Sequence, residues 1–176
     1  VKTALEEVYD KGYGKYGHAK GITELRKVLS EVENVTFEDI MICPGARFAV
    51  YLAITTLLNP GDEIIVIEPS WPAYKDCALN AGIKVRTIKT TLETRWEPSI
   101  DQIKNAVNEN TKMIVLNYPN NPTGKILSRK IWDDIIEIAK EHDLYVLSDE
   151  IYEQYYFGEI IGTSLWEYEY EKSIIT

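Results

Sequence analysis

The chain has 176 residues, with 19 Lys and Arg against 28 Asp and Glu, so its formal net charge at pH 7 is −9. This length suits one domain or most of one, and 45% hydrophobic with 27% charged residues is typical of a globular protein. The acidic balance argues against nucleic acid as a partner. No apolar run is long enough to span a bilayer, so a membrane partner is not expected either.

The two cysteines, Cys43 and Cys77, lie far apart, without a Cys-x-x-Cys pair or a histidine cluster. This spacing predicts neither a disulfide framework nor a metal site, and it favours a cytoplasmic location. The chain shows no signal peptide and begins with Val1 rather than Met, so we expect further sequence upstream.

Helices and strands are predicted to alternate along most of the chain. The first part, through Glu31, is expected to form two helices around a glycine-containing turn at 12–17. Short apolar runs are typical of strands buried on both faces, whereas longer stretches with one apolar face are typical of helices. Strands are predicted at 40–43, 64–67, 83–88, 113–116, 144–147 and 172–176, and further helices at 46–58, 74–81, 99–107 and 128–142.

Two helix starts carry a cap signal. Ser99 with Gln102 three residues later is typical of a capping box, and Ser128 is a candidate N-cap for helix 128–142. The alternation predicts an α/β fold, a three-layer α/β/α domain with a largely parallel sheet. No linker or repeat divides the chain, so we expect residues 1–176 to belong to one domain.

Two familiar motifs occur in the wrong context. Gly12, Gly14 and Gly17 spell the G-x-G-x-x-G of dinucleotide-binding proteins, but the segment before them is predicted to be a helix rather than a strand. Asp149 ends an apolar run, as does the magnesium-binding acid of P-loop ATPases, but Gly124-Lys125 lacks the phosphate-binding loop that such enzymes require. A structural alternative for Asp149 is the cap of a following helix.

Four segments at predicted strand ends indicate a ligand pocket. Residues 43–47 lead into a helix whose N-terminus can bind an anion, and residues 69–74 contain an aromatic pair. Residues 117–124 supply amides, and residues 148–152 supply a carboxylate and a phenol. The carboxyl ends of parallel strands meet at one edge of a sheet, so this set predicts a site for a flat, anionic heteroaromatic cofactor.

Six sequence blocks, taken in order, resemble the class I/II aminotransferases, the aspartate-aminotransferase-like family of fold type I pyridoxal-phosphate enzymes. The resemblance covers nearly the whole chain. The blocks are Tyr16-Gly17-His18-Ala19-Lys20-Gly21 with Glu24-Leu25-Arg26, Pro44-Gly45-Ala46-Arg47, Asn59-Pro60-Gly61-Asp62, Pro69-Ser70-Trp71-Pro72-Ala73-Tyr74, Asn120-Asn121-Pro122-Thr123-Gly124 and Ser148-Asp149-Glu150-Ile151-Tyr152.

The resemblance implies pyridoxal 5'-phosphate as cofactor and a role for each ring-contacting residue. Asp149 would pair with the protonated pyridine nitrogen, which makes the ring an electron sink. Tyr152 and Asn121 would hydrogen-bond the phenolic oxygen of the ring, and Trp71 would stack on its face. The resemblance thus implies an enzyme that moves an amino group between an amino acid and a 2-oxo acid.

The resemblance also implies where the phosphate binds and how the protein assembles. The backbone amides of Gly45, Ala46 and Arg47 would hold the phosphate group. Tyr16 would reach the phosphate of a neighbouring subunit, which implies a homodimer.

The family's Schiff-base lysine has no counterpart in the printed sequence. By the resemblance it would follow Thr176, and Lys125 stands in the wrong motif. We therefore expect residues 1–176 to be part of the large, cofactor-binding domain, without the lysine segment and the C-terminal small domain. The alternatives are a C–S lyase, decarboxylase or synthase on the same scaffold, or a catalytically inactive fragment.

Overall fold

The structure is a computed structural model that describes residues 1–12, 16–157 and 161–176. The chain divides into two compact units, unit 1 (Val1–Pro44) and unit 2 (Gly45–Thr176). The elements of unit 1 are α1 (Lys2–Asp10), α2 (Thr23–Val32) and the 3₁₀ helix η1 (Phe37–Asp39). Those of unit 2 are α3 (Ala46–Leu57), β1 (Glu63–Glu68), α4 (Ala73–Asn80), β2 (Lys84–Lys89), α5 (Ile100–Ala106), β3 (Thr111–Asn117), α6 (Arg129–Glu141), β4 (Tyr145–Asp149), η2 (Leu165–Glu167) and β5 (Ser173–Ile175).

Unit 1 is organised around a buried arginine. Arg26 of α2 is only 1% exposed, and its guanidinium donates to the backbone oxygens of Phe37 and Ile40, both at 2.8 Å. The same group lies 4.0 Å from the centre of the Phe37 ring. These contacts hold the segment after η1 against α2, because a buried guanidinium needs acceptors for its N–H groups.

The strand predicted at 40–43 is wrong. These residues are extended in part but belong to no strand. Their polar backbone atoms bond elsewhere: the Ile42 N–H donates to the Lys20 oxygen at 2.9 Å, and the Ile40 oxygen accepts from Arg26. A strand requires a ladder with a neighbouring strand, and no described residue pairs with this segment in that way.

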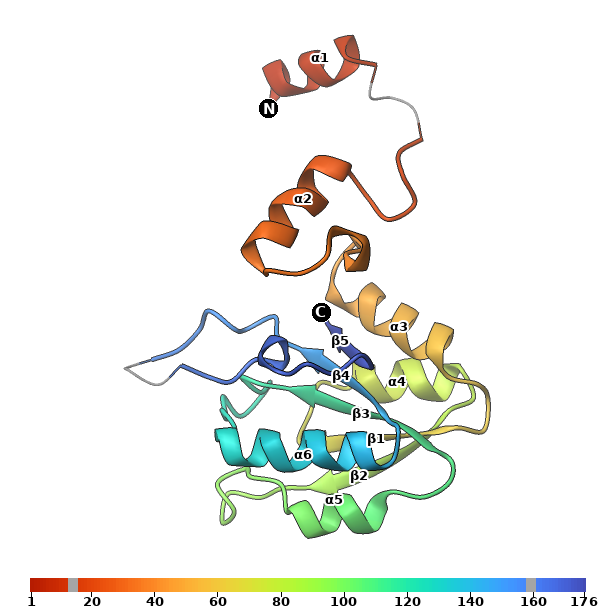
Figure 1. Cartoon of the computed structure of the whole chain (residues 1–176), viewed down its shortest axis with the longest axis vertical. Helices are drawn as coiled ribbons and strands as arrows, with labels where there is room; N and C mark the ends of the chain where they lie inside the picture. The colour runs from red at the N-terminus through yellow and green to blue at the C-terminus, as the bar shows by residue number, and fades with distance from the viewer. Residues whose placement is uncertain (13–15, 158–160) are drawn as a thin grey trace. The chain divides into compact units, whose positions relative to one another are not determined.

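Unit 2 contains a five-stranded sheet, in the order β2-β1-β3-β4-β5, and all four neighbouring pairs are parallel (Figure 1). The predicted strands at 64–67, 83–88, 113–116, 144–147 and 172–176 are confirmed, with small shifts of their ends. β2 is an edge strand, and its alternating exposure agrees with the alternating sequence of that segment.

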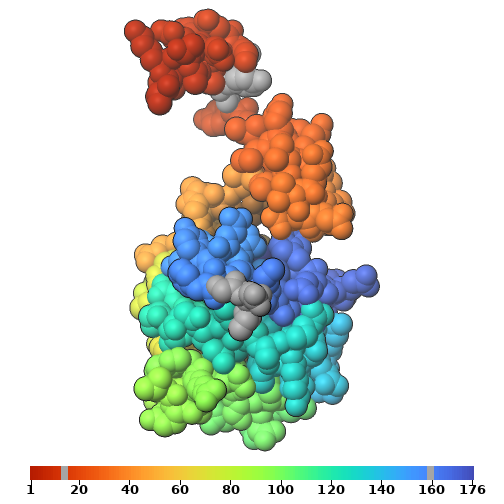
Figure 2. All heavy atoms as spheres, turned by 90° about the vertical axis from the view of Figure 1, so that its left-hand side faces the viewer, coloured from red at the N-terminus to blue at the C-terminus, as the bar shows by residue number. Residues whose placement is uncertain are grey.

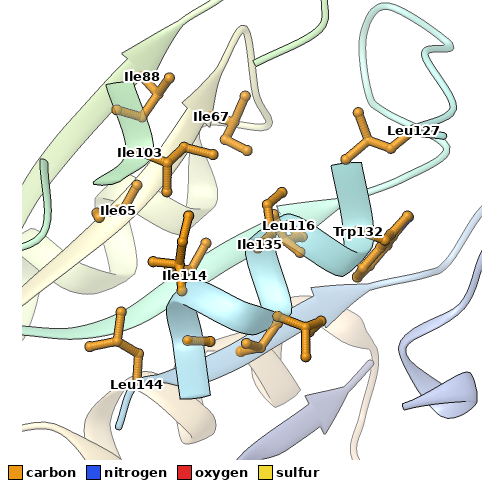
Figure 3. Close-up of a cluster of buried hydrophobic side chains, with 14 of the residues drawn as sticks. Ile65, Ile67, Ile88, Ile103, Ile114, Leu116, Leu127, Trp132, Ile135 and Leu144 are labelled. Atoms are coloured by element: carbon orange, nitrogen blue, oxygen red, sulfur yellow. The ribbon is translucent and has the colours of Figure 1, made fainter. Parts of the chain in front are cut away.

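Helices cover both faces of this sheet, which confirms the three-layer α/β/α fold (Figure 1). In β1, Ile65 and Ile67 pack with α5 and α6, whereas Ile64 and Val66 pack with α3 and α4. Successive side chains of a strand point to opposite faces, so a continuous apolar run fills both layers. Figure 3 shows the α5 and α6 side, where Trp132 and Ile135 of α6 lie over the sheet.

The predicted helix caps are present. The Ser99 hydroxyl accepts from the Gln102 N–H at 3.3 Å, which is the N-cap half of the expected capping box. The Ser128 hydroxyl accepts from the Ile131 N–H at 3.4 Å. These caps begin α5 and α6, the two helices of one layer. None of the helices in the described residues is long and apolar enough to cross a membrane.

Candidate functional site

A cavity of about 360 Å³ lies at the carboxyl edge of the sheet in unit 2. It is bounded by the N-terminus of α3, the start of α4, the ends of β3 and β4, and the turns that follow these strands. The lining residues are Gly45, Ala46, Arg47, Trp71, Tyr74, Asn117, Asn121, Asp149, Ile151 and Tyr152. Seven of the eight predicted site residues are therefore brought together here.

Asp149, the last residue of β4, is a buried acid without a cationic partner. It is 2% exposed, and none of the ion pairs among the described residues includes it. Its Oδ2 accepts from the Tyr74 hydroxyl at 2.6 Å, and its Oδ1 from the Ile151 N–H at 3.4 Å. Burial raises the pKa of Asp149, and the two hydrogen bonds oppose this shift. A cation entering the cavity would meet a strong acceptor.

Tyr74 is the main residue that sequence reasoning left without a role. Burial, and then the negative charge of Asp149, raise the pKa of the Tyr74 phenol, with Tyr152 adding to the shift. The phenol is therefore held as a donor to Asp149. The signal was present in the sequence, because Trp71 and Tyr74 stand one helical turn apart, and their rings meet edge to face at 5.5 Å between centroids.

Trp71 is half-buried, and it lines the cavity while also packing against the α3 and α4 layer. Trp71 therefore contributes to the hydrophobic core and also presents a surface to the cavity. The Arg47 guanidinium lies 5.0 Å from the centre of the Trp71 ring, a cation–π distance. Sequence reasoning assigned Arg47 only a backbone role, so this contact of its side chain is new.

The N-terminus of α3 opens onto the same cavity. Its N-cap residue, Gly45, has φ +95°, which favours glycine, and a Cβ built there would meet no atom within 4 Å. The N–H groups of Ala46 and Arg47 stand in the first turn, where no intrahelical acceptor exists. Open space beside free amides at a helix N-terminus suits an anion, as expected.

Asn117 connects two of the predicted residues. Its Nδ2 donates to the backbone carbonyl oxygen of Asp149 at 2.8 Å, and its Oδ1 accepts from the Asn121 N–H at 2.9 Å. The register of β3 and β4 places Asn117 directly beside Asp149. Sequence reasoning assigned Asn117 no role, because the pairing of two strand ends 32 residues apart is not visible in a local pattern.

Three predictions concern residues outside this cavity. Tyr16 lies in unit 1 and is fully exposed, so its predicted contact with a partner subunit remains a prediction. Gly14, the central glycine of the G-x-G-x-x-G motif, lies outside the described residues, but the segment before it is helix α1, as expected. Lys125 lies elsewhere, with its Nζ 2.9 Å from Glu97.

The structural alternative for Asp149 is wrong. A turn rather than a helix follows Asp149, so it caps no helix. Within residues 1–12, 16–157 and 161–176, there is no group of three or more His, Cys, Asp or Glu side chains that could hold a metal ion.

A second, larger cavity of about 700 Å³ adjoins the first and shares Asn121 and Tyr152 with it. It lies between the turn after β3 and the segment after β4. In the space-filling view, the blue surface of the segment after β4 borders the blue-green surface of the neighbouring turn (Figure 2). Tyr152 therefore lies between the two cavities and lines both of them.

Together, these features define an α/β domain with a cavity that suits a planar, anionic ligand at the carboxyl edge of a parallel sheet. The comparison with known proteins gives the class a name. The sequence model of the family described as "Aminotransferase class I and II" matches residues 1–175. The chain belongs to this family.

Curated relatives and solved structures agree with this assignment. The chain is 36% identical over 165 residues to the aspartate aminotransferase of Sulfolobus acidocaldarius and 37% identical over 166 residues to the aspartate/prephenate aminotransferase of Thermus thermophilus. These matches cover 89% and 90% of the chain but only 41% and 43% of the relatives. A solved aromatic aminotransferase from Pyrococcus horikoshii superposes with a TM-score of 0.90 at 29% identity, covering 99% of this chain and 49% of that one.

Aminotransferases of this family depend on pyridoxal phosphate. The residues that line the cavity fit three parts of this cofactor. Asp149 is a buried carboxylate lacking a cationic side-chain partner among the described residues, which suits a protonated ring nitrogen. The free amides of Ala46 and Arg47 suit a phosphate group, and the Trp71 indole suits a flat ring.

Proposed function

We propose that this chain is the cofactor-binding part of a pyridoxal-phosphate-dependent aminotransferase that acts on an amino acid and a 2-oxo acid. The observation that carries the proposal is the buried Asp149 carboxylate, which faces a cavity closed by Trp71 and by the N-terminus of α3. The names of the relatives above favour amino transfer over lyase, decarboxylase or synthase chemistry.

The cofactor, when bound, supplies an electron-withdrawing ring that stabilises negative charge on a substrate carbon. Asp149 holds the proton on the ring nitrogen, and Tyr74 keeps the carboxylate oriented through its 2.6 Å hydrogen bond. Asn121 and Tyr152 would hydrogen-bond the phenolic oxygen of the ring. The Trp71 indole would stack on the ring and exclude water from it.

The phosphate group belongs at the N-terminus of α3 in this proposal. The amides of Gly45, Ala46 and Arg47 bind it, and the helix dipole favours its negative charge. The site also includes Tyr16 of a second subunit, so the working protein is a homodimer. The proposal places it in the cytoplasm, in agreement with its free cysteines, Cys43 and Cys77.

The proposal assigns the residues described here to the large domain, with the lysine that holds the cofactor covalently located outside these 176 residues. Among the residues that the structure describes, no lysine lines the cavity. The nearest candidates by sequence are engaged elsewhere, because Lys75 pairs with Glu68 and Lys125 pairs with Glu97. The chain alone should then bind the cofactor reversibly and weakly.

Borohydride reduction tests this assignment. The 176-residue chain is mixed with pyridoxal phosphate, reduced, digested and mapped, and free cofactor is measured by equilibrium dialysis. We expect reversible binding, only scattered substoichiometric adducts on surface lysines, and no turnover. A single stoichiometric adduct on one lysine, together with amino transfer, would show that the chain carries its own catalytic lysine. An absence of any binding would contradict the cofactor site itself.

A further inference from the structure

Glu150 is a second buried acid beside the site, and the chemistry proposed above does not use it. It is 5% exposed, and none of the ion pairs in the described part of the chain includes it. Its carboxylate accepts three hydrogen bonds. Oε1 accepts from the Ser148 hydroxyl at 2.7 Å and from the Leu165 N–H at 2.9 Å, and Oε2 accepts from the Ser164 hydroxyl at 2.6 Å.

These hydrogen bonds join two points that are 14 residues apart in the chain. Glu150 directly follows β4, whereas Ser164 is the N-cap residue of η2. The η2 end is firmly held, because Leu165 is 1% exposed in the hydrophobic core and Ser164 forms a capping box with Glu167. Glu150 therefore ties the end of β4 to a rigid anchor.

Tyr152 lies just after this tie, and its side chain borders open space on two sides. It lines both cavities, its residue is 36% exposed, and among the described residues its one ring contact is with Tyr155, at 6.3 Å between centroids. Tyr155 is itself 68% exposed, so it gives weak support. A side chain that borders two cavities depends for its position on the backbone that carries it.

A second contact closes the same segment a little further on. The hydroxyl of Tyr156 lies against Gly162, where a Cβ built on the glycine would come within 2.4 Å of it. Gly162 stands two residues before Ser164, so this contact and the Glu150 hydrogen bonds act on the same two stretches of chain. The Tyr152 segment, residues 151–157, is therefore held at both ends.

We propose that Glu150 is a positioning residue that holds Tyr152 at the wall of the cofactor cavity. The inference rests on the proposed function, because it gives Tyr152 its role there. Glu150 acts as a hydrogen-bond acceptor and not through its charge. Three donors, two hydroxyls and one backbone N–H, converge on it, and they would all be left without this partner if the carboxylate were removed.

Two substitutions separate the acceptor role from the charge. In Glu150→Ala all three hydrogen bonds are lost. In Glu150→Gln the amide oxygen still accepts from Ser148 and Leu165, and the amide N–H₂ can donate to the Ser164 oxygen. Glu137→Ala is the matched control, because Glu137 is an exposed acid on α6, away from both cavities.

The experiment measures two quantities on the full 176-residue chain and its variants. Hydrogen exchange without cofactor reports the backbone amides of residues 151–157 and 164–165, and equilibrium dialysis reports the dissociation constant for pyridoxal phosphate. In Glu150→Ala we expect exchange in these amides to be at least about tenfold faster, and the dissociation constant to be about tenfold higher. Glu150→Gln should stay within about threefold of wild type in both, and Glu137→Ala should match wild type.

Each of the other possible results contradicts one part of the proposal. Wild-type exchange and affinity in Glu150→Ala would overturn the positioning role, and equal losses in Glu150→Gln and Glu150→Ala would show a role of the charge instead. If Glu150→Ala fails to fold, Ser164→Ala removes one of the three hydrogen bonds together with the side-chain cap of η2, and unchanged exchange there would contradict the tie. If the wild-type chain binds no pyridoxal phosphate, the proposed function fails, while the exchange data still decide whether Glu150 holds the segment.

Discussion

A carboxylate is buried at the amino edge of the sheet and another at the carboxyl edge, and the two acids differ in the groups that donate hydrogen bonds to them. Glu63 begins β1 at the amino edge and is 7% exposed. Both of its oxygens accept from Arg86, at 2.9 and 3.1 Å, and Oε1 also accepts from Asn108 and Thr111. Asp149 ends β4 at the carboxyl edge with one strong donor, Tyr74, and no ion pair to any described residue.

The pKa values show the same contrast. Burial alone would raise the pKa of Glu63, but hydrogen bonds from Arg86 and Asn108 bring it below its ordinary value. Burial raises the pKa of Asp149, and the hydrogen bond from Tyr74 only partly offsets it. A fully partnered buried acid holds strands together, whereas an acid buried without a cation is costly for the fold and available to a ligand.

The largest expected effect comes from replacing Asp149 by its neutral isostere. In Asp149→Asn we expect the affinity of the chain for pyridoxal phosphate to fall at least about tenfold, because a neutral amide cannot hold the ring nitrogen protonated. Its free energy of unfolding at pH 7 should not fall, since the substitution removes a buried, unpaired charge. Equilibrium dialysis and urea unfolding measure the two quantities.

In a complete parent enzyme the same substitution should cripple amino transfer. Activity within about threefold of wild type, equivalent to less than about 0.7 kcal/mol of transition-state stabilisation, would rule out the role assigned to Asp149.

Glu63→Gln is the matched substitution at the other edge, and the opposite pattern is expected. The free energy of unfolding should fall by about 1 kcal/mol, because Asn108 and Thr111 lose a charged acceptor for their hydrogen bonds. The lost ion pair with Arg86 adds little to this fall, because Arg86 is exposed and water screens its charge. Cofactor affinity should stay within about twofold of wild type, since Glu63 lies at the far end of β1 from the cavity. Urea unfolding measures the free energy, and equilibrium dialysis measures the affinity for pyridoxal phosphate. A large loss of affinity would contradict the view that Glu63 has only a structural role.

The smallest effect is a difference in how the two variants respond to pH. The pKa of Glu63 is lowered in the folded chain, so its contribution to stability is present above about pH 4.3, the ordinary glutamate value, and is lost as the pH falls below it. The advantage of wild type over Glu63→Gln should therefore shrink on acidification.

Asp149 has a raised pKa in the folded chain, so the folded state binds this proton more tightly than the unfolded chain does. Its cost to stability should therefore appear as the pH rises through the folded pKa and disappear on acidification. Wild type should gain on Asp149→Asn as the pH falls. Urea unfolding of the three proteins from about pH 7 down to about pH 3 gives both slopes, and slopes of the same sign would refute the assigned pKa directions.

Local sequence patterns were sufficient for the layers of the fold. The unbroken apolar runs of β1 and β3 predicted strands buried on both faces, and Ser99 and Ser128 predicted the starts of two helices. These signals are local, because side-chain alternation and capping depend on residues only a few positions apart. The strand predicted at 40–43 shows the limit, since an apolar run forms a strand only where another strand pairs with it.

The sequence by itself also determined which residues stand at strand ends, and hence that Trp71, Asn121 and Asp149 would meet at one edge of the sheet. Only the tertiary structure decided their partners. The phenol that holds Asp149 lies 75 residues away in the chain, and the serine that holds Glu150 lies 14 residues away. Such pairs are set by strand register and by the packing of whole elements, and a buried acid becomes structural or functional according to which donors that packing brings to it.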